Sequence, residues 1–114
     1  MTTLYGIPNC DTVKKARARL GAGGTTYALH DYKKMGVDAE RLDAWIARVG
    51  WERMLNRAGT TFRKLPEADR VDIDPAKARA LMVAHPSLIK RPVVEHRDRL
   101  LVGFDPAEWN AAGL

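Results

Sequence analysis

Cysteine is nearly absent from the sequence, which has only Cys10 among its 114 residues. A single cysteine excludes an intramolecular disulfide and a cysteine-rich metal site, and it suits a reducing compartment. No apolar run approaches the roughly 20 residues that a membrane-spanning helix needs. No basic-then-apolar signal pattern opens the chain. We therefore expect a cytoplasmic protein with no membrane partner.

Blocks of like charge are also absent, although the net charge is +5 and the pI is near 9.7. The basic residues are spread from Lys14 to Arg99 and are interleaved with acidic ones. Neither a helix-turn-helix pattern nor zinc-finger spacing is present, so we expect no direct nucleic-acid binding. The carboxylates show no metal-ligand clustering, and we expect no metal. The net positive charge fits a binding site for a small anion better than it fits nucleic-acid binding.

The residues around Cys10 are typical of a turn between a strand and a helix. A short strand is predicted over residues 2–6, and apolar residues recur at helical spacing over residues 11–20. Asn9 or Cys10 therefore lies at or near the N-cap, where backbone N–H groups and the helix dipole favour a thiolate. We interpret Cys10 as a reactive thiol; a buried structural cysteine is the alternative.

The rest of the chain alternates between strand and helix signals. No repeat or low-complexity linker interrupts it, so residues 1–114 predict a single domain. The elements predicted after the first helix are a strand over 25–30, a helix capped by Asp38, a loop over 59–63, a helix starting at Asp74-Pro75 and ended by His85-Pro86, a hairpin of strands over 89–95 and 100–104, and a last helix capped by Asp105.

This order predicts an α/β protein with the thioredoxin-like arrangement. Its four-stranded mixed sheet has helices on its faces, and a helical insertion lies between about residues 38 and 88. Pro92 supports the arrangement, because a proline at the start of an inner strand is unusual unless it serves a turn. In this fold it faces the active-site cysteine, and we predict a cis Arg91–Pro92 bond.

Chemistry at Cys10 requires help from other groups. Position 13 is Val13, so a Cys-x-x-Cys dithiol cycle is excluded and the resolving thiol must come from glutathione or another protein. Arg63 and Arg91 are candidates for an anion site, because an arginine fork binds oxyanions and holds a nearby thiolate ionised. The three histidines are interpreted as structural or solvated residues, and become candidate bases only if folding brings one to Cys10.

Three segments resemble the arsenate reductase-like family: YGIPNCDTVKKA (residues 5–16), GTTFRKL (59–65) and IKRPV (89–93). The family includes glutaredoxin-coupled arsenate reductases, Spx-type regulators that bind RNA polymerase, and small proteins proposed as glutathione-dependent thiol reductases. The resemblance covers nearly the whole chain. It implies a nucleophilic Cys10, with Arg63, Arg91 and Asn9 binding the anion or stabilising the thiolate, and Pro92 structural at the site.

Departures from the family patterns separate its branches. Val13 removes the Cys-x-x-Cys switch of Spx-type regulators. Gly6 stands where arsenate reductases carry a histidine, and Gly103-Phe104-Asp105 stands where they carry a third arginine. The resemblance therefore favours a cytoplasmic monothiol reductase that uses glutathione as co-substrate and no bound cofactor. An arsenate reductase, with glutaredoxin as partner, and an Spx-type RNA polymerase-binding regulator are the alternatives.

Overall fold

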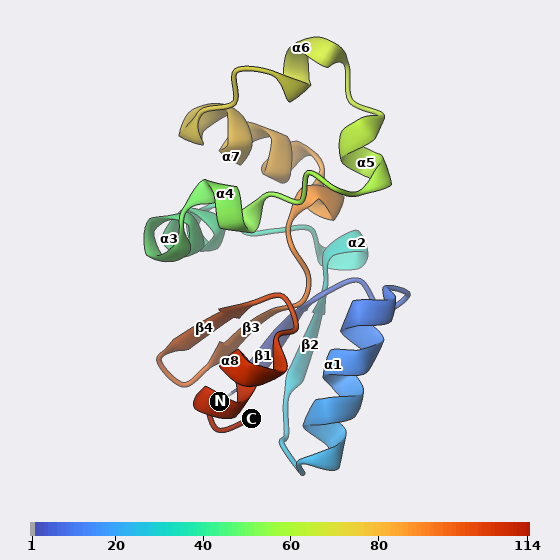
Figure 1. Ribbon diagram of the computed structural model, residues 1–114, viewed down its shortest axis with the longest axis vertical. Coiled ribbons are helices and arrows are strands. Elements are labelled where there is room, and N and C mark those ends of the chain that lie inside the picture. The colour runs from blue at the N-terminus through green and yellow to red at the C-terminus, as the bar shows by residue number, and fades with distance from the viewer. Residues whose placement is uncertain (1) are drawn as a thin grey trace. The chain divides into compact units, whose positions relative to one another are not determined.

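The computed structural model describes residues 2–114, which divide into two compact units. The first unit comprises Met1–Met35 and Arg91–Leu114, and the second is Gly36–Lys90 (Figure 1). The predicted insertion falls inside the second unit, and the single-domain organisation stays a prediction.

A four-stranded sheet forms the centre of the first unit, in the order β2-β1-β3-β4. Strand β1 (Thr2–Gly6) runs parallel to β2 (Ala28–Asp31) and antiparallel to β3 (Val93–His96), which pairs with β4 (Arg99–Val102). The predicted mixed sheet is therefore confirmed. The β3–β4 hairpin turns at Arg97 and Asp98, where Arg97 has a φ of 58°.

Several predicted boundaries are wrong by a few residues. Helix α1 (Asp11–Ala22) continues through Gly21, with Gly23 at its C-cap. Strand β2 begins at Ala28 and not at residue 25, and β3 begins at Val93 and not at residue 89. The proline ring removes the N–H that Pro92 would donate to a strand ladder, so regular pairing starts after it.

Helices α1 and α8 (Pro106–Ala111) pack against one face of this sheet. A side chain of β1 on this face is Leu4, which lies opposite Val94 in β3, and Val94 lies opposite Leu101 in β4. The buried residues of this core are Leu4, Val13, Ala16, Leu20, Val94, Leu101 and Trp109. The register of the strands thus brings apolar residues from both ends of the sequence onto one helix-covered face.

Gly6 is required where α1 approaches the end of β1. A Cβ atom at this position would lie 2.9 Å from Val13 Cγ2. Val13 is fully buried, and its branched side chain has one strongly preferred rotamer in a helix, so it cannot easily move away. A side chain at position 6 would overpack the core.

We therefore expect Gly6→Ala to lower the free energy of unfolding by about 1–3 kcal/mol. Urea denaturation measures this change. The matched control is Gly21→Ala in α1, where nothing lies within 4 Å of the added Cβ. That control should stabilise the protein, by up to about 1 kcal/mol, because alanine favours a helix more than glycine does. Equal effects of the two substitutions would contradict the close approach at Gly6.

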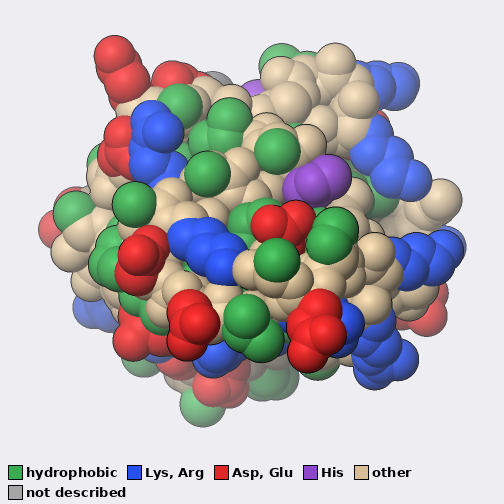
Figure 2. All heavy atoms as spheres, turned by 90° about the horizontal axis from the view of Figure 1, so that it is seen from above, with side chains coloured by type: hydrophobic (Ala, Val, Ile, Leu, Met, Phe, Trp, Pro, Cys, Tyr) green, Lys and Arg blue, Asp and Glu red, His purple; other side chains and the backbone are tan. Residues whose placement is uncertain are grey.

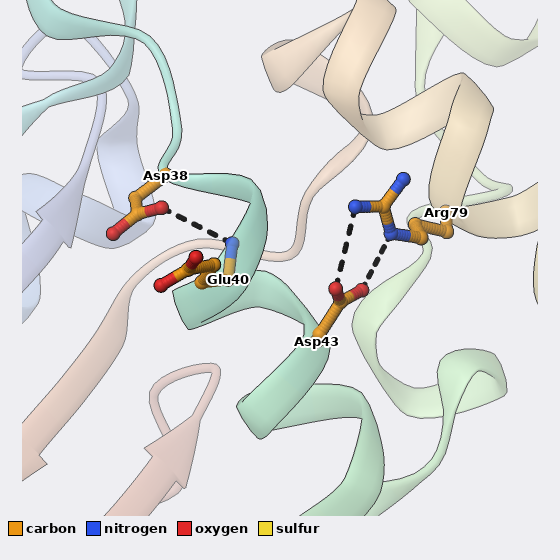
Figure 3. Close-up of polar contacts among 4 residues, drawn as sticks. All are labelled: Asp38, Glu40, Asp43 and Arg79. Atoms are coloured by element: carbon orange, nitrogen blue, oxygen red, sulfur yellow. Dashed lines mark hydrogen bonds and ion pairs between the residues drawn. The ribbon is translucent and has the colours of Figure 1, made fainter.

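The second unit consists of short helices. They are α3 (Ala39–Val49), α4 (Trp51–Met54), α5 (Thr60–Arg63), α6 (Glu67–Arg70), α7 (Pro75–Ala84) and the 3-10 turn η1 (Pro86–Leu88). Asp38 caps α3 by accepting a hydrogen bond from the Glu40 N–H at 3.1 Å. An exposed ion pair joins Asp43 of α3 to Arg79 of α7 (Figure 3). The helix starts that the sequence predicts at Asp38 and at Asp74-Pro75 are both confirmed.

The predicted loop over residues 59–63 is wrong, because this segment contains helix α5. Its single turn is closed by the Arg63 N–H, which donates to the Gly59 carbonyl at 3.3 Å, and by the Lys64 N–H, which donates to the Thr60 carbonyl at 3.1 Å. One turn is too short to show helical periodicity in the sequence.

Ile89 also differs from its predicted place in a strand of the hairpin. It forms an isolated antiparallel bridge with Leu55 inside the second unit. The Asn56 N–H donates to the Leu88 carbonyl at 2.7 Å, and the Lys90 N–H donates to the Met54 carbonyl at 2.8 Å. Both segments therefore satisfy their backbone groups within this unit.

Candidate functional site

Cys10 lies at the N-cap of α1, as the sequence predicts. A tight turn leads to it from β1, and the Cys10 N–H donates to the Ile7 carbonyl at 3.0 Å. Its own carbonyl accepts the first helical hydrogen bond, from the Lys14 N–H at 2.9 Å. Cys10 is partly exposed and also packs against the core of the first unit, so its role as a reactive thiol stays a prediction.

The surroundings of Cys10 favour the thiolate. Burial acts to raise the pKa of the thiol, but the Val13 N–H, the Arg91 side chain and the Thr12 N–H outweigh it, and the pKa is lowered. The sulfur makes no regular capping hydrogen bond, yet these N–H groups lie close enough to stabilise negative charge on it. This is the expected effect of a helix N-terminus on a cysteine.

Arg91 is the charged residue that the fold brings to Cys10. Both the side chain of Arg91 and its positive charge act to lower the pKa of the Cys10 thiol. The Arg91–Pro92 peptide bond is cis, which confirms that prediction. Pro92 and Arg91 lie at the entrance of β3, beside the end of β1, where a Cβ on Gly6 would lie 3.6 Å from Arg91 Cβ.

The other two predicted anion-binding residues are Asn9 and Arg63. Asn9 is exposed in the turn directly before Cys10. Arg63 is exposed in the second unit, where its Nη2 donates to the Ala58 carbonyl at 2.9 Å. The roles of both residues at Cys10 stay predictions.

Two histidines of the first unit have structural contacts that the sequence could not specify. The ring of His30 lies 5.0 Å from that of Tyr5 and 6.0 Å from that of Tyr32. His96 Nδ1 shares a 2.6 Å hydrogen bond with Thr2 Oγ1. Burial and the nearby Arg97 lower the pKa of His96.

Tyr32 is a residue near the site that the sequence analysis did not single out. It is the first residue of α2 (Tyr32–Met35) and is almost completely buried. The charge of Arg91 acts on its hydroxyl as well as on the Cys10 thiol. Its position directly after a strand is the only signal in the sequence, and it is too weak to indicate a site.

Comparison with known proteins identifies the family. The ArsC family model matches residues 5–112. The chain belongs to the ArsC family. The structure of a protein named YFFB is 55% identical to it, covers 98% of each chain and has a TM-score of 0.94. An arsenate reductase (ArsC) related protein from Brucella melitensis is 58% identical, covers 96% of this chain and 92% of its own, and has a TM-score of 0.77.

A second branch of relatives consists of transcription regulators. The global transcriptional regulator Spx of Streptococcus agalactiae is 28% identical over 116 residues, which cover 97% of this chain and 82% of the relative. Membership of the ArsC family confirms the resemblance seen in the sequence and the thioredoxin-like fold class. The chain is an arsenate reductase-like protein.

The surface of this ArsC-family protein does not carry one large patch of a single charge on the face that Figure 2 shows. Basic and acidic side chains are interspersed there. Within residues 2–114, no three His, Cys, Asp or Glu side chains gather in a group that could hold a metal ion. No helix in this part of the chain is long and apolar enough to cross a membrane.

We expect the pKa of Cys10 in this ArsC-family protein to lie below that of a free thiol, and Arg91→Ala to raise it. The alkylation rate of Cys10 by the neutral reagent iodoacetamide, followed against pH, measures the pKa because only the thiolate reacts. The rate should therefore reach its plateau at a lower pH in the parent than in Arg91→Ala. A matched control is Arg99→Ala, at the exposed start of β4. A titration at or above the free-thiol pKa in the parent would contradict the prediction.

Proposed function

We propose that this protein is a cytoplasmic monothiol reductase that uses Cys10 as nucleophile and glutathione as co-substrate. The observation that carries the proposal is the partly exposed Cys10 at a helix N-cap, with its pKa lowered by backbone N–H groups and Arg91. Cys10 is the only cysteine, so the enzyme has no resolving thiol of its own. The second thiol must come from solution or from a partner such as glutaredoxin.

The reaction has two exchange steps. In the first, the Cys10 thiolate attacks the glutathionyl sulfur of a glutathione mixed disulfide, forms a protein–glutathione disulfide and releases the substrate as a thiolate. In the second, a glutathione thiolate attacks the glutathionyl sulfur of that adduct, and oxidised glutathione and the Cys10 thiolate leave. In the net reaction, the mixed disulfide and one reduced glutathione give the substrate thiol and one oxidised glutathione, half of which is the glutathionyl group of the substrate, so electrons and atoms balance.

Glutathione carries two carboxylates, which require positive partners. Arg91 is the first proposed partner, because it lowers the pKa of the Cys10 thiol and a guanidinium fork can bind a carboxylate in bidentate fashion. Arg63 and Asn9 are proposed as further contacts on the basis of the family motifs. A lysine in place of Arg91 would keep the charge and lose the fork.

We therefore expect Arg91→Lys to weaken glutathione binding roughly ten- to a hundredfold, because about 1.5–3 kcal/mol of charge-assisted hydrogen bonding is lost. Binding is measured from the rate at which reduced glutathione removes the glutathione adduct from Cys10, followed as a function of the concentration of reduced glutathione. Arg63→Ala should change binding in the same direction. Unchanged binding by Arg91→Lys would exclude the bidentate role.

The proposed function is tested by intact mass spectrometry of the protein mixed with oxidised glutathione. We expect one glutathione adduct per chain, located at Cys10 and removed by reduced glutathione. Turnover of a small glutathione mixed disulfide is then measured with reduced glutathione as the only reductant. A folded protein that forms no adduct, or an adduct that reduced glutathione does not remove, would contradict the proposal.

Similarity to Spx supports a second candidate, a regulator that binds RNA polymerase. Against it, Val13 occupies the second position of the cysteine pair that Spx-type proteins use as a switch. A pull-down with purified polymerase subunits separates the candidates. Binding that survives Cys10→Ser, together with no disulfide turnover, would favour the regulator.

A further inference from the structure

Tyr32 lies at the end of the sheet where the Cys10 turn begins. Strands β1 and β2 are parallel, and their register pairs Gly6 with Asp31. Tyr32 follows Asp31 directly, just as Ile7 follows Gly6 and opens the turn toward Cys10. The C-terminal ends of two neighbouring parallel strands therefore bring Tyr32 and the Cys10 turn to the same edge.

The hydroxyl group of Tyr32 is unusual among the buried groups of residues 2–114. Only 1% of the residue's surface is exposed, and the hydroxyl makes no hydrogen bond to any other described residue. A buried hydroxyl without a partner is costly, so a folded protein rarely retains one without a use for it. Phenylalanine would fill the same space without this cost.

The neighbouring tyrosine shows the contrast. The Tyr5 hydroxyl donates to Glu95 Oε1 at 2.5 Å, so its bonding is satisfied. The two phenol rings are linked through the ring of His30, which lies 5.0 Å from Tyr5 and 6.0 Å from Tyr32. A positive group acts on Tyr32 as well, because Arg91 lies close enough for its charge to favour the ionised phenol.

Tyr32 nevertheless stays a hydrogen-bond donor at neutral pH. Burial raises the pKa of its hydroxyl strongly, and Tyr5 and Glu95 raise it further, while Arg91 opposes the rise. Arg91 is thus a common neighbour of a protonated phenol and of the Cys10 thiol. A hydroxyl donor beside a guanidinium is a combination that binds the oxygens of a carboxylate or another small oxyanion.

We propose that Tyr32 is a further binding residue of the Cys10 site, whose hydroxyl donates to a carboxylate or other small anion held against Arg91. The anion supplies the missing partner of the hydroxyl, and a local movement of the side chains that cover Tyr32 must admit it. This inference deepens the proposed function, since the carboxylates of glutathione belong to this chemical class.

The test compares two alkylating reagents that differ in charge. Iodoacetate carries a carboxylate and iodoacetamide does not. The rate of Cys10 alkylation by iodoacetate divided by the rate with iodoacetamide therefore reports anion binding beside the sulfur. We expect Tyr32→Phe to lower this ratio about tenfold, as the loss of one hydrogen bond to a charged group implies. The iodoacetamide rate and its pH profile should stay unchanged, and thermal unfolding should show equal or higher stability.

The matched control is Tyr27→Phe, because Tyr27 Oη accepts a hydrogen bond from Arg17 Nε at 2.9 Å and is not part of the site. It should leave the rate ratio unchanged. An unchanged ratio in Tyr32→Phe would overturn the inference, and so would equal losses of rate with both reagents, which indicate a displaced thiol. The assay uses no glutathione, so its outcome is independent of whether the protein reduces glutathione mixed disulfides.

Discussion

Replacement of Cys10 by serine is expected to reduce turnover of a glutathione mixed disulfide by about a thousandfold or more, to the uncatalysed background. A serine hydroxyl cannot form the protein–glutathione disulfide, and no other cysteine is present to replace it. Serine is at the same time a favourable N-cap residue, so α1 should keep its stability or gain from the substitution. Turnover is measured with purified protein and reduced glutathione.

The control for this prediction is the folding of the variant. The free energy of unfolding of Cys10→Ser, from urea denaturation, should equal that of the parent or exceed it by up to about 1 kcal/mol. Loss of activity in a folded variant then assigns the chemistry to the sulfur. Residual turnover in Cys10→Ser close to that of the parent would exclude Cys10 as nucleophile.

Arsenate is expected to be a poor substrate, with turnover roughly a hundred- to a thousandfold below that of a glutathione mixed disulfide. When the Cys10 thiolate attacks the arsenate dianion, it brings a further negative charge to the oxyanion. Loss of one hydrogen-bond donor to such a developing oxyanion typically lowers the rate about a hundred- to a thousandfold. By the family resemblance, arsenate reductases carry a third arginine at the position where this chain has Phe104. Its ring packs edge-on against Trp109 with centroids 4.8 Å apart, and Asp105 beside it has the wrong charge.

Phe104→Arg tests the explanation. It should raise arsenate turnover while lowering stability, because the ring contact with Trp109 is lost. Phe104→Met is the matched control, since it loses the same contact without adding charge, and it should leave arsenate turnover low. Arsenate turnover by the parent at rates typical of enzymes, abolished by Cys10→Ser, would instead identify an arsenate reductase.

Local signals in the sequence determined much of the secondary structure. Aspartate caps predicted the starts of three helices, and in each the carboxylate of Asp38, Asp74 or Asp105 accepts a backbone N–H. Capping depends on residues within one turn of each other, so a linear sequence contains the information. Cys10 at the N-cap of α1 is a prediction of the same kind.

Boundaries that depend on distant partners were less accessible. Ile89 has strand-like residues around it, but its bridge partner Leu55 lies far away in the sequence. The single turn of α5 has no periodicity to reveal it. For Ile89 the distant hydrogen-bond partner decides the conformation, whereas the hydrogen bonds of α5 are local and its turn is only too short to show a pattern.

At the site, the sequence by itself determined that Cys10 lies at the start of α1, while the tertiary structure decided its neighbours. Arg91 is 81 positions beyond Cys10 and was a candidate from the chemistry of its side chain and from the family resemblance; in the folded chain it is among the groups that lower the pKa of the thiol. Nothing in the sequence indicated that position 6 needs a glycine, and the position of Tyr32 after a strand was too weak a signal to reveal its buried hydroxyl. Both arise from the close approach of separate segments, and the free energy of such contacts depends on distances of a few ångströms, which only the folded chain sets.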